Sequence, residues 1–282
     1  MIELVESIDQ YNNLLNEAKK NIITPVSNNH LFAEAMVDYI DQGMLYYSFD
    51  SSGLRLYIKQ RNYYTCYFVL EKQCMPEFDK LDMPIYAYIL RTKKDQSFYA
   101  VQDKLLEAGF SHHETRKGFD YSPEEVYNIT LRVADFARSL LEKRGFTISI
   151  PNPEHYSELL DFVNSIDEIP FWQLDFPTYE LFLKEIESER IKCVFDSNKA
   201  IVGMYYRLRV GKYEYGYIAI EKQYRDSGAM AVALTNERMK GIIEQEGKGR
   251  AWISTNNVKS LKYHESLGCI ANGRYKEEFL LE

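Results

Sequence analysis

The feature that most constrains the fold is a short stretch in the second half of the chain, QYRDSGAM at residues 223–230. An apolar run at 214–220 precedes it and a long run with helical periodicity at 229–246 follows it, which predicts a strand, a tight turn and a helix. The first turn of a helix has unpaired backbone N–H groups and the positive end of the helix dipole, and both favour an anion. Gly228 would let a phosphate approach the backbone, and Arg225 would add a positive charge. The stretch predicts a pyrophosphate site, with an ordinary connecting loop as the alternative.

The rest of the second half alternates helical and strand patterns. The turn cluster Asp196-Ser197-Asn198 lies between two apolar runs, which predicts a hairpin. The predicted fold class is α/β, with a mixed, mostly antiparallel central sheet flanked by helices. Besides the strand and helix above, we expect helices at 153–165, 178–189 and 258–267, and strands at 191–195, 199–210, 250–254 and 274–281.

A helix is predicted near the middle of the chain. Ser122 suits the capping position, Pro123 suits the first turn, and Glu125 completes a capping box. We predict an N-terminal domain at 1–121, a connecting helix at 122–145 and a C-terminal domain at 146–282. The apolar residues that recur with helical period along the connecting helix are Val126, Ile129, Val133, Phe136 and Leu140.

Length and composition set the broad class. A chain of 282 residues with 45% hydrophobic and 27% charged residues has the balance of a globular protein with two cores. The net charge of -8 argues against general nucleic-acid binding, because phosphate contacts need a basic face. No window approaches the roughly 18 apolar residues of a membrane span and no signal-peptide pattern is present, so we expect a cytoplasmic protein without a membrane partner. No metal site is expected, because no metal-ligand spacing joins Cys66, Cys74, Cys193 and Cys269.

Two sequence blocks resemble signatures of the GNAT superfamily, the acyl-CoA-dependent N-acyltransferases. IEKQYRDSGAM resembles the cofactor-binding motif, a strand followed by a Y-R-x-x-G-x-G/A turn. NNVKSLKYHESLGC resembles the second signature, an Asn, a small residue three positions later and a helix that closes on L-G-F. The resemblance covers residues from about Phe146 to the C-terminus. In the second block the matching residues are Asn257, Ser260, Leu267, Gly268 and Cys269.

The resemblance implies where acetyl-CoA, or another acyl-CoA, would bind as co-substrate. The strand at 217–220 would separate from the strand at 250–254, and the acyl-pantetheine arm would lie in the opening. Asn257 would contact the arm, with Ser260 close by. The pyrophosphate would be held by backbone amides, and the residues implied in binding are Ile218, Ala219, Ile220, Arg225, Asp226, Ser227, Gly228, Ala229 and Met230.

Three departures from the family pattern affect this site. Met230 replaces a Gly or Ala, which places a larger side chain near the cofactor, and Cys269 replaces the usual Phe. His264 stands where the family has a tyrosine acid, and Tyr263 directly precedes it. Histidine titrates near neutral pH and suits either acid or base duty, whereas tyrosine suits acid duty. Backbone N–H groups near Ala219 would polarise the thioester carbonyl, and Glu221 or Glu214 would accept the amine proton.

The first half repeats the plan faintly. We expect helices at 7–18 and 28–42, and a third helix that ends in the stretch VQDKLLEAGF. Strands are expected at 44–49, 54–59, 63–70 and 85–90, and a final strand begins at 117–121. EKQCMPEF, which follows the third of these strands, has no arginine-and-glycine turn, and Leu105 stands where an acid would be. We interpret residues 1–121 as a degenerate GNAT-like copy that has lost cofactor binding, with a different small α/β domain as the alternative.

The leading functional prediction is an N-acyltransferase that moves an acetyl or other short acyl group from acyl-CoA to an amine of a small molecule or peptide. The alternative from another class is a non-catalytic acyl-CoA- or protein-binding module of the same fold. A transferase that uses aminoacyl-tRNA is a third reading, against which the acidic charge counts. Phe171, Trp172 and Phe176 either line the acceptor pocket or pack between two helices.

Overall fold

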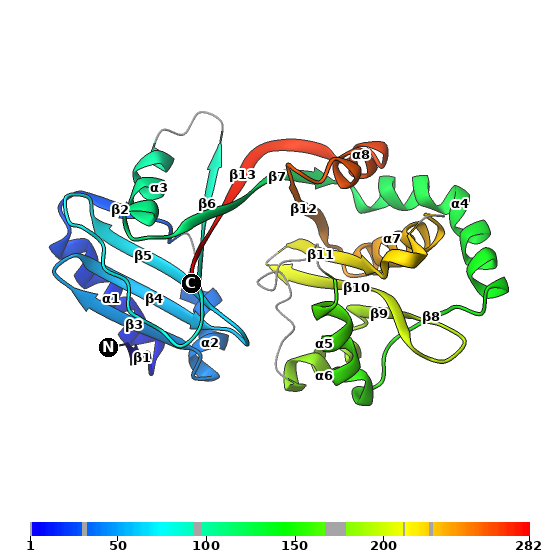
Figure 1. Ribbon diagram of the computed structural model, residues 1–282, viewed down its shortest axis with the longest axis horizontal. Helices are drawn as coiled ribbons and strands as arrows, with labels where there is room; N and C mark the ends of the chain where they lie inside the picture. The colour runs from blue at the N-terminus through cyan, green and yellow to red at the C-terminus, as the bar shows by residue number, and fades with distance from the viewer. Residues whose placement is uncertain (1, 30–32, 93–96, 167–178, 211, 226–227) are drawn as a thin grey trace. The chain divides into compact units, whose positions relative to one another are not determined.

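The computed structural model describes residues 2–29, 33–92, 97–166, 179–210, 212–225 and 228–282. The chain groups into two compact units: an N-terminal unit, Met1–Lys117 with Gly273–Glu282, and a C-terminal unit, Gly118–Asn272 (Figure 1). These units divide the chain at other positions than the predicted domains, because two strands run from one unit into the other. β7 (Ser111–Tyr121) starts in the N-terminal unit, and β13 (Ile270–Leu281) ends in it.

The C-terminal unit has a mixed sheet, as predicted. Strands β8 to β11 pair antiparallel in sequence order, whereas β11 and β12 pair in parallel. β11 is paired with β10 along its whole length, so its other edge is the one that faces β12. The order across the sheet is β7, β12 (Lys248–Ser254), β11 (Tyr213–Ile220), β10 (Ile201–Val210), β9 (Ile191–Phe195) and β8 (Thr147–Ser149).

Helices cover both faces of this sheet. α5 (Tyr156–Asn164) and α6 (Tyr179–Glu187) pack on one face, in a core that includes Leu159, Phe182 and Met204. α4 (Pro123–Lys143) and α7 (Ala229–Glu244) pack on the other, in a core that includes Leu141, Leu234 and Tyr205. α8 (Val258–Ser266) follows β12.

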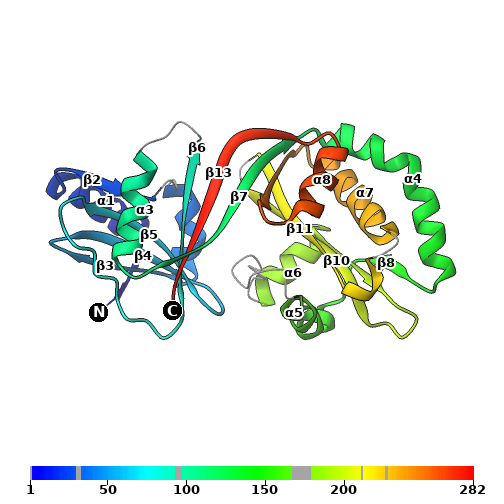
Figure 2. The ribbon, with the colours of Figure 1, turned by 45° about the horizontal axis from the view of Figure 1, so that its top comes forward.

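The predicted central helix is α4, and it lies side by side with α7 (Figures 1 and 2). Ser122 caps it by accepting a hydrogen bond from the Glu125 N–H at 3.2 Å. The buried face differs from the predicted one. Small residues let α7 approach closely, so the buried set is Val126, Thr130, Ala134, Ala137 and Leu141, whereas Ile129, Val133 and Phe136 are 38%, 50% and 74% exposed.

The N-terminal unit has a sheet of similar plan. Its order is β1 (Glu3–Leu4), β3 (Leu45–Asp50), β4 (Gly53–Lys59), β5 (Tyr64–Glu71), β6 (Ile85–Thr92) and β13, and β2 (Pro25–Ser27) pairs with β5 outside this order. Its helices are α1 (Ile8–Asn21), a 3-10 turn at Ala33–Met36, α2 (Val37–Asp41) and α3 (Ser97–Glu107). The helix predicted at 28–42 is therefore shorter in the structure.

The last strand belongs with the N-terminal unit for most of its length. The sequence predicts residues 274–281 as part of the C-terminal domain, but β13 pairs antiparallel with β6 from Arg274↔Thr92 to Leu281↔Ile85. Two buried acids support this pairing, because Glu277 accepts from Arg91 Nε at 2.7 Å and Glu278 accepts from the Tyr86 hydroxyl at 3.0 Å, and both partners lie on β6. Burial alone would raise the pKa of Glu278, but Lys276 and Arg116 lower it to about 2.

Among the described residues, no helix is long and apolar enough to cross a bilayer.

Candidate active site

An opening in the sheet forms the centre of the candidate site. β11 and β12 pair only at Tyr213↔Lys248 and Glu214↔Gly249, and beyond these residues the two strands separate. The predicted separation of 217–220 from 250–254 is therefore present. A separated pair of parallel strands exposes backbone donors and acceptors, which suits an extended ligand that carries amide groups.

Alternation along β11 decides which backbone groups face the opening. Glu221 N–H bonds to Val202 O on the β10 side at 2.9 Å, and Ala219 pairs with Met204 there. The N–H groups of Ile218 and Ile220 therefore point to the other edge, toward the opening. The sequence places the donors that would polarise the thioester carbonyl near Ala219. In the structure the N–H groups that face the opening are those of its two neighbours, Ile218 and Ile220.

The turn after β11 starts α7 with a left-handed glycine. Gly228 has φ +64° and occupies the N-cap of α7, where its carbonyl accepts from Val232 N–H at 3.0 Å. A Cβ at Gly228 would meet no atom within 4 Å, so the backbone conformation, rather than crowding, calls for glycine here. Asp226 and Ser227 lie outside the described residues. The N–H groups of the first turn of α7 have no acceptor within the helix, and they lie at the positive end of the helix dipole.

Arg225 and Met230 frame this turn in different ways. Arg225 Nε donates to Ile220 O at 2.7 Å, which ties the turn to the end of β11. Met230 is 1% exposed and its Sδ would lie 2.7 Å from a Cβ on Gly203, so its side chain points into the core. The helix turns position 230 toward the sheet, and contact of this residue with the cofactor stays a prediction. Ala229 is also buried, and backbone binding at these positions stays a prediction.

Asn257 and Ser260 start α8. Asn257 is its N-cap, and Oδ1 accepts from Ser260 N–H at 2.9 Å. This bond occupies the side-chain oxygen and leaves the amide Nδ2 as the group with which Asn257 would contact a pantetheine arm.

His264 has a defined tautomer. Its Nδ1 lies 2.8 Å from Ser260 O and 3.4 Å from Ser260 Oγ. A backbone oxygen only accepts, so Nδ1 carries the proton and, in the neutral ring, Nε2 is an acceptor. Burial lowers the pKa of His264, which favours this neutral form near pH 7. The sequence allows His264 to act as an acid or as a base, and this geometry suits the role of a base.

Tyr263 points to a different environment. Its hydroxyl lies 2.8 Å from Thr235 Oγ1 on α7, and its ring packs beside a core that includes Met239 and Leu267. Burial raises the pKa of Tyr263. The neighbouring candidates Tyr263 and His264 therefore have different partners: Tyr263 bonds to α7, whereas His264 bonds within α8.

The two candidate carboxylates also differ. Glu221 is half-buried at the end of β11 and accepts from Gln223 Nε2 at 2.8 Å. Glu214 is fully buried where β11 and β12 are still paired, at the closed end of the opening. Neither carboxylate oxygen of Glu214 has a hydrogen-bond partner within the described part of the chain. Glu214 is therefore remote from solvent, which does not suit proton transfer from an incoming amine.

The N-terminal unit contains a second opening that the sequence reading missed. β5 and β6 pair in parallel only at Tyr64↔Ile85 and Thr65↔Tyr86. The tripeptide Glu-Lys-Gln begins with the last residue of β5, at 71–73, and directly follows β11, at 221–223, and this repeat was the available signal. It aligns Phe68 with Ile218 and Cys66 with Gly216.

This second opening is filled by the chain itself. Asn28 is 4% exposed; its Oδ1 accepts from Phe68 N–H at 2.8 Å, and its Nδ2 donates to Cys66 O at 3.0 Å and to Tyr88 O on β6 at 3.3 Å. The preceding β2 pairs with the end of β5, and Glu71 Oε2 accepts from Ile23 N–H at 2.8 Å and Thr24 N–H at 3.1 Å. An amide therefore occupies the edge of β5 that corresponds to the open edge of β11.

Within the described residues, no cluster of histidine, cysteine and acidic side chains could hold a metal ion, and the four cysteines are free thiols.

Comparison with known proteins finds no matching protein-family model and no matching curated sequence. Solved structures match at low identity. A GCN5-related N-acetyltransferase from Sphaerobacter thermophilus is 12% identical, with a TM-score of 0.53 over 100% of this chain and 95% of that chain. An acetyltransferase of the GNAT family from Colwellia psychrerythraea is 11% identical, with a TM-score of 0.50 over 100% of both chains. A tandem GNAT protein from the clavulanic acid biosynthesis pathway is 9% identical, with a TM-score of 0.53 over 100% of this chain and 98% of that chain. We conclude that this chain has a mixed α/β fold that matches that of GNAT acetyltransferases, one of them a tandem GNAT protein.

Proposed function

We propose that this protein is an N-acyltransferase that moves an acetyl or other short acyl group from acyl-CoA to an amine of a small molecule or peptide. One observation carries the proposal: β11, which forms one edge of the opening, is followed along the chain by a helix that starts at a left-handed glycine. The donor edge suits the amide-bearing arm of coenzyme A, and the helix start suits its diphosphate. The printed names of the fold relatives support the same reaction class.

The residues of this chain fit acyl-CoA as co-substrate. Gly228 leaves the first turn of α7 unobstructed, and the Met230 side chain lies in the core. The bound thioester supplies the activated acyl group. The N–H groups of Ile218 and Ile220 would donate to its carbonyl oxygen and stabilise negative charge that develops there.

His264 is proposed as the proton acceptor. When the amine nitrogen attacks the acyl carbon, a C–N bond forms, the C–S bond breaks and the amine loses a proton. Nε2 of neutral His264 would take that proton, directly or through water, and the resulting imidazolium could return it to the leaving thiolate. Tyr263 takes no part in this scheme, because its hydroxyl is bonded to Thr235.

We further propose that each chain binds one acyl-CoA. The N-terminal unit holds Asn28 in the opening between β5 and β6, and residues 72–84 after β5 form no helix that would start at a phosphate. These two features support our interpretation of the N-terminal unit as a degenerate copy that has lost cofactor binding.

Calorimetric titration of the full chain with acetyl-CoA, followed by a coenzyme A release assay over a panel of amines, tests the proposal. We expect one site per chain and turnover with at least one amine. Binding without turnover over a broad panel would instead identify a non-catalytic acyl-CoA-binding module, and no binding would remove acyl-CoA from the account.

A further inference from the structure

A cavity of about 530 Å³ lies at the C-terminal end of α7, between this helix and strands β9 and β10. Gly241 of α7 and Arg207 of β10 line it, as do Lys192, Glu237, Glu244 and Gln245. Gly228 and Gly241 are thirteen residues apart on one helix, about 20 Å at the usual rise per residue. The cavity is therefore separate from the acyl-CoA site proposed above, and its volume suits a small molecule.

Arg207 is a wholly buried cation at this cavity. It is 0% exposed, and Nη2 donates to Glu189 O at 3.2 Å. A Cβ on Gly241 would lie 2.8 Å from the Arg207 Cζ, so a larger residue at this position would displace the guanidinium from its place against α7. Nε and Nη1 of Arg207 have no hydrogen-bond partner among the described residues. A buried guanidinium with unused donors is costly unless another acceptor meets it.

Gln245 brings an unused acceptor to the same cavity. Its Nε2 donates to Ser188 O at 3.2 Å, which fixes the orientation of the carboxamide. Its Oε1 is buried and lacks a hydrogen-bond partner in the part of the chain that the structure describes. Arg207 and Gln245 both line the cavity, and their unused donors and acceptor lie beneath its surface.

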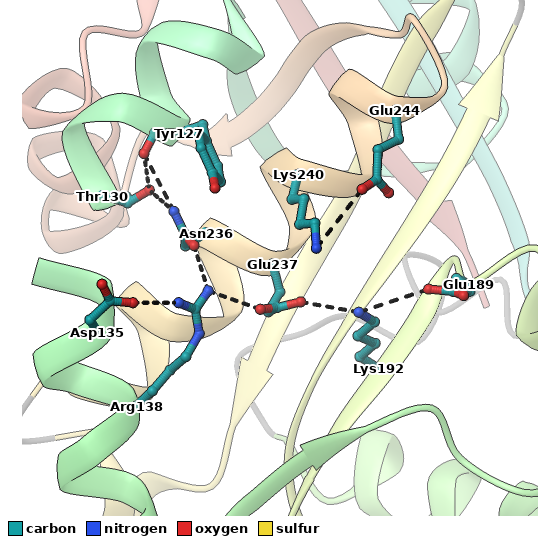
Figure 3. Close-up of polar contacts among 10 residues, drawn as sticks. All are labelled: Tyr127, Thr130, Asp135, Arg138, Glu189, Lys192, Asn236, Glu237, Lys240 and Glu244. Carbon is teal, nitrogen blue, oxygen red and sulfur yellow. Dashed lines mark hydrogen bonds and ion pairs between the residues drawn. The ribbon is translucent and has the colours of Figure 1, made fainter. Parts of the chain in front are cut away.

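The other charged side chains at the cavity are either mostly buried in its wall or exposed at its rim, and Figure 3 shows their polar contacts. In the wall, Glu237 accepts from Lys192 Nζ at 3.0 Å and from Arg138 Nη2 at 2.9 Å, so these charges satisfy one another. At the rim, Lys240 and Glu244 are 4.0 Å apart, and both are more than half exposed. Glu244 is thus available to a cation that enters the cavity.

We propose that this cavity binds a small α-amino acid or a similar zwitterion. The carboxylate would bind the Nε and Nη1 donors of Arg207, and the ammonium group would donate to Gln245 Oε1 and lie near Glu244. A compound with only one of these charges leaves one buried group unsatisfied. A nucleotide or another polyanion is disfavoured by the carboxylates at the rim.

Calorimetric titration of the full chain with the twenty amino acids tests the site, with acetate and ethylamine as single-charge probes. At least one amino acid should bind saturably with a Kd below about 10 mM. Acetate and ethylamine should bind at least about tenfold more weakly, because each lacks a charge-assisted contact. The Gly241 amide resonance should shift on binding, which locates the ligand.

Substitutions on the cavity provide the second arm. Gln245→Leu and Glu244→Gln should each weaken amino-acid binding by about threefold to tenfold, because each removes one partner of the ammonium group. Both should leave acetyl-CoA binding unchanged. Gln42→Leu, at an exposed position in the N-terminal unit, is the control and should change neither. The proposal is overturned if no amino acid binds, if all three classes of probe bind alike, or if both cavity variants bind as the parent does; water would then be what satisfies Arg207.

Discussion

The two openings in this molecule share a strand geometry and differ in what occupies the exposed edge. β5–β6 and β11–β12 each pair in parallel at two positions and then separate, and a Glu-Lys-Gln tripeptide stands where the first strand of each pair ends. In the N-terminal unit Asn28 bonds to the exposed edge, whereas in the C-terminal unit the turn leads to Gly228 and α7. The backbone groups at the edge of a separated strand need hydrogen-bond partners. Asn28 supplies an amide partner in the N-terminal unit, and we propose that acyl-CoA supplies one in the C-terminal unit.

The largest effect is expected from Gly228→Val. A β-branched residue at φ +64° is strained by about 1–3 kcal/mol, so the turn should relax and move the N–H groups of the first turn of α7. We expect acetyl-CoA affinity to fall at least about tenfold. Gly43→Val is a matched control, because Gly43 has φ +66° and no atom within 4 Å of an added Cβ. It should lower stability by a similar amount and leave affinity unchanged; equal losses in both variants would contradict the role of the turn.

His264→Phe should lower kcat by about tenfold to a hundredfold, with the Kd of acetyl-CoA unchanged, because a general base contributes on this scale. The base is the neutral ring and burial lowers its pKa, so kcat/KM should decline only as pH falls below histidine's usual value of about 6.5. Tyr263→Phe should keep most of the turnover. A larger loss in Tyr263→Phe than in His264→Phe would reverse the two assignments.

Asn28→Ala should destabilise the protein by about 3 kcal/mol, because it leaves buried backbone groups of β5 and β6 without a partner. Chemical denaturation measures the loss, and Asn13→Ala on the exposed face of α1 serves as control. The number of acetyl-CoA sites should stay at one, because no glycine-led helix follows β5. A second site in this variant would show that Asn28 alone had closed the N-terminal opening.

The smallest effect is expected at Glu71, the last residue of β5. Hydrogen bonds from backbone N–H groups, with that of Thr24 first, lower the pKa of Glu71. A lowered pKa gives stability that is present above the unfolded-state pKa, about 4.3, and is lost as pH falls through the folded-state value. Glu71→Gln should therefore weaken the acid dependence of unfolding, measured by thermal scans from neutral to acidic pH. An acid dependence of unfolding in Glu71→Gln that equals that of the parent protein would contradict this role of Glu71.

The sequence predicted what depends on local pattern. The strand, glycine turn and helix around Gly228 and the capped helix at Ser122 follow from short stretches of residues, whereas the separation of 217–220 from 250–254 was implied by the resemblance to the GNAT family. Properties that depend on distant partners were not accessible. The buried face of α4 is set by α7, the direction of Met230 by space at Gly203, and the orientation of Tyr263 by Thr235. Asn28 in the opening of β5 is of the same kind, because residues forty positions apart meet there.

The path of β13 has a consequence for how the protein is made. Residues 274–281 form the neighbour of β6, so the N-terminal unit lacks one strand until the last residues of this sequence have left the ribosome. Domains usually fold in the order of synthesis. Here the N-terminal unit begins before the C-terminal unit and is completed after it, and a nascent chain stalled at residue 272 would leave one edge of β6 unpaired and able to pair with another chain.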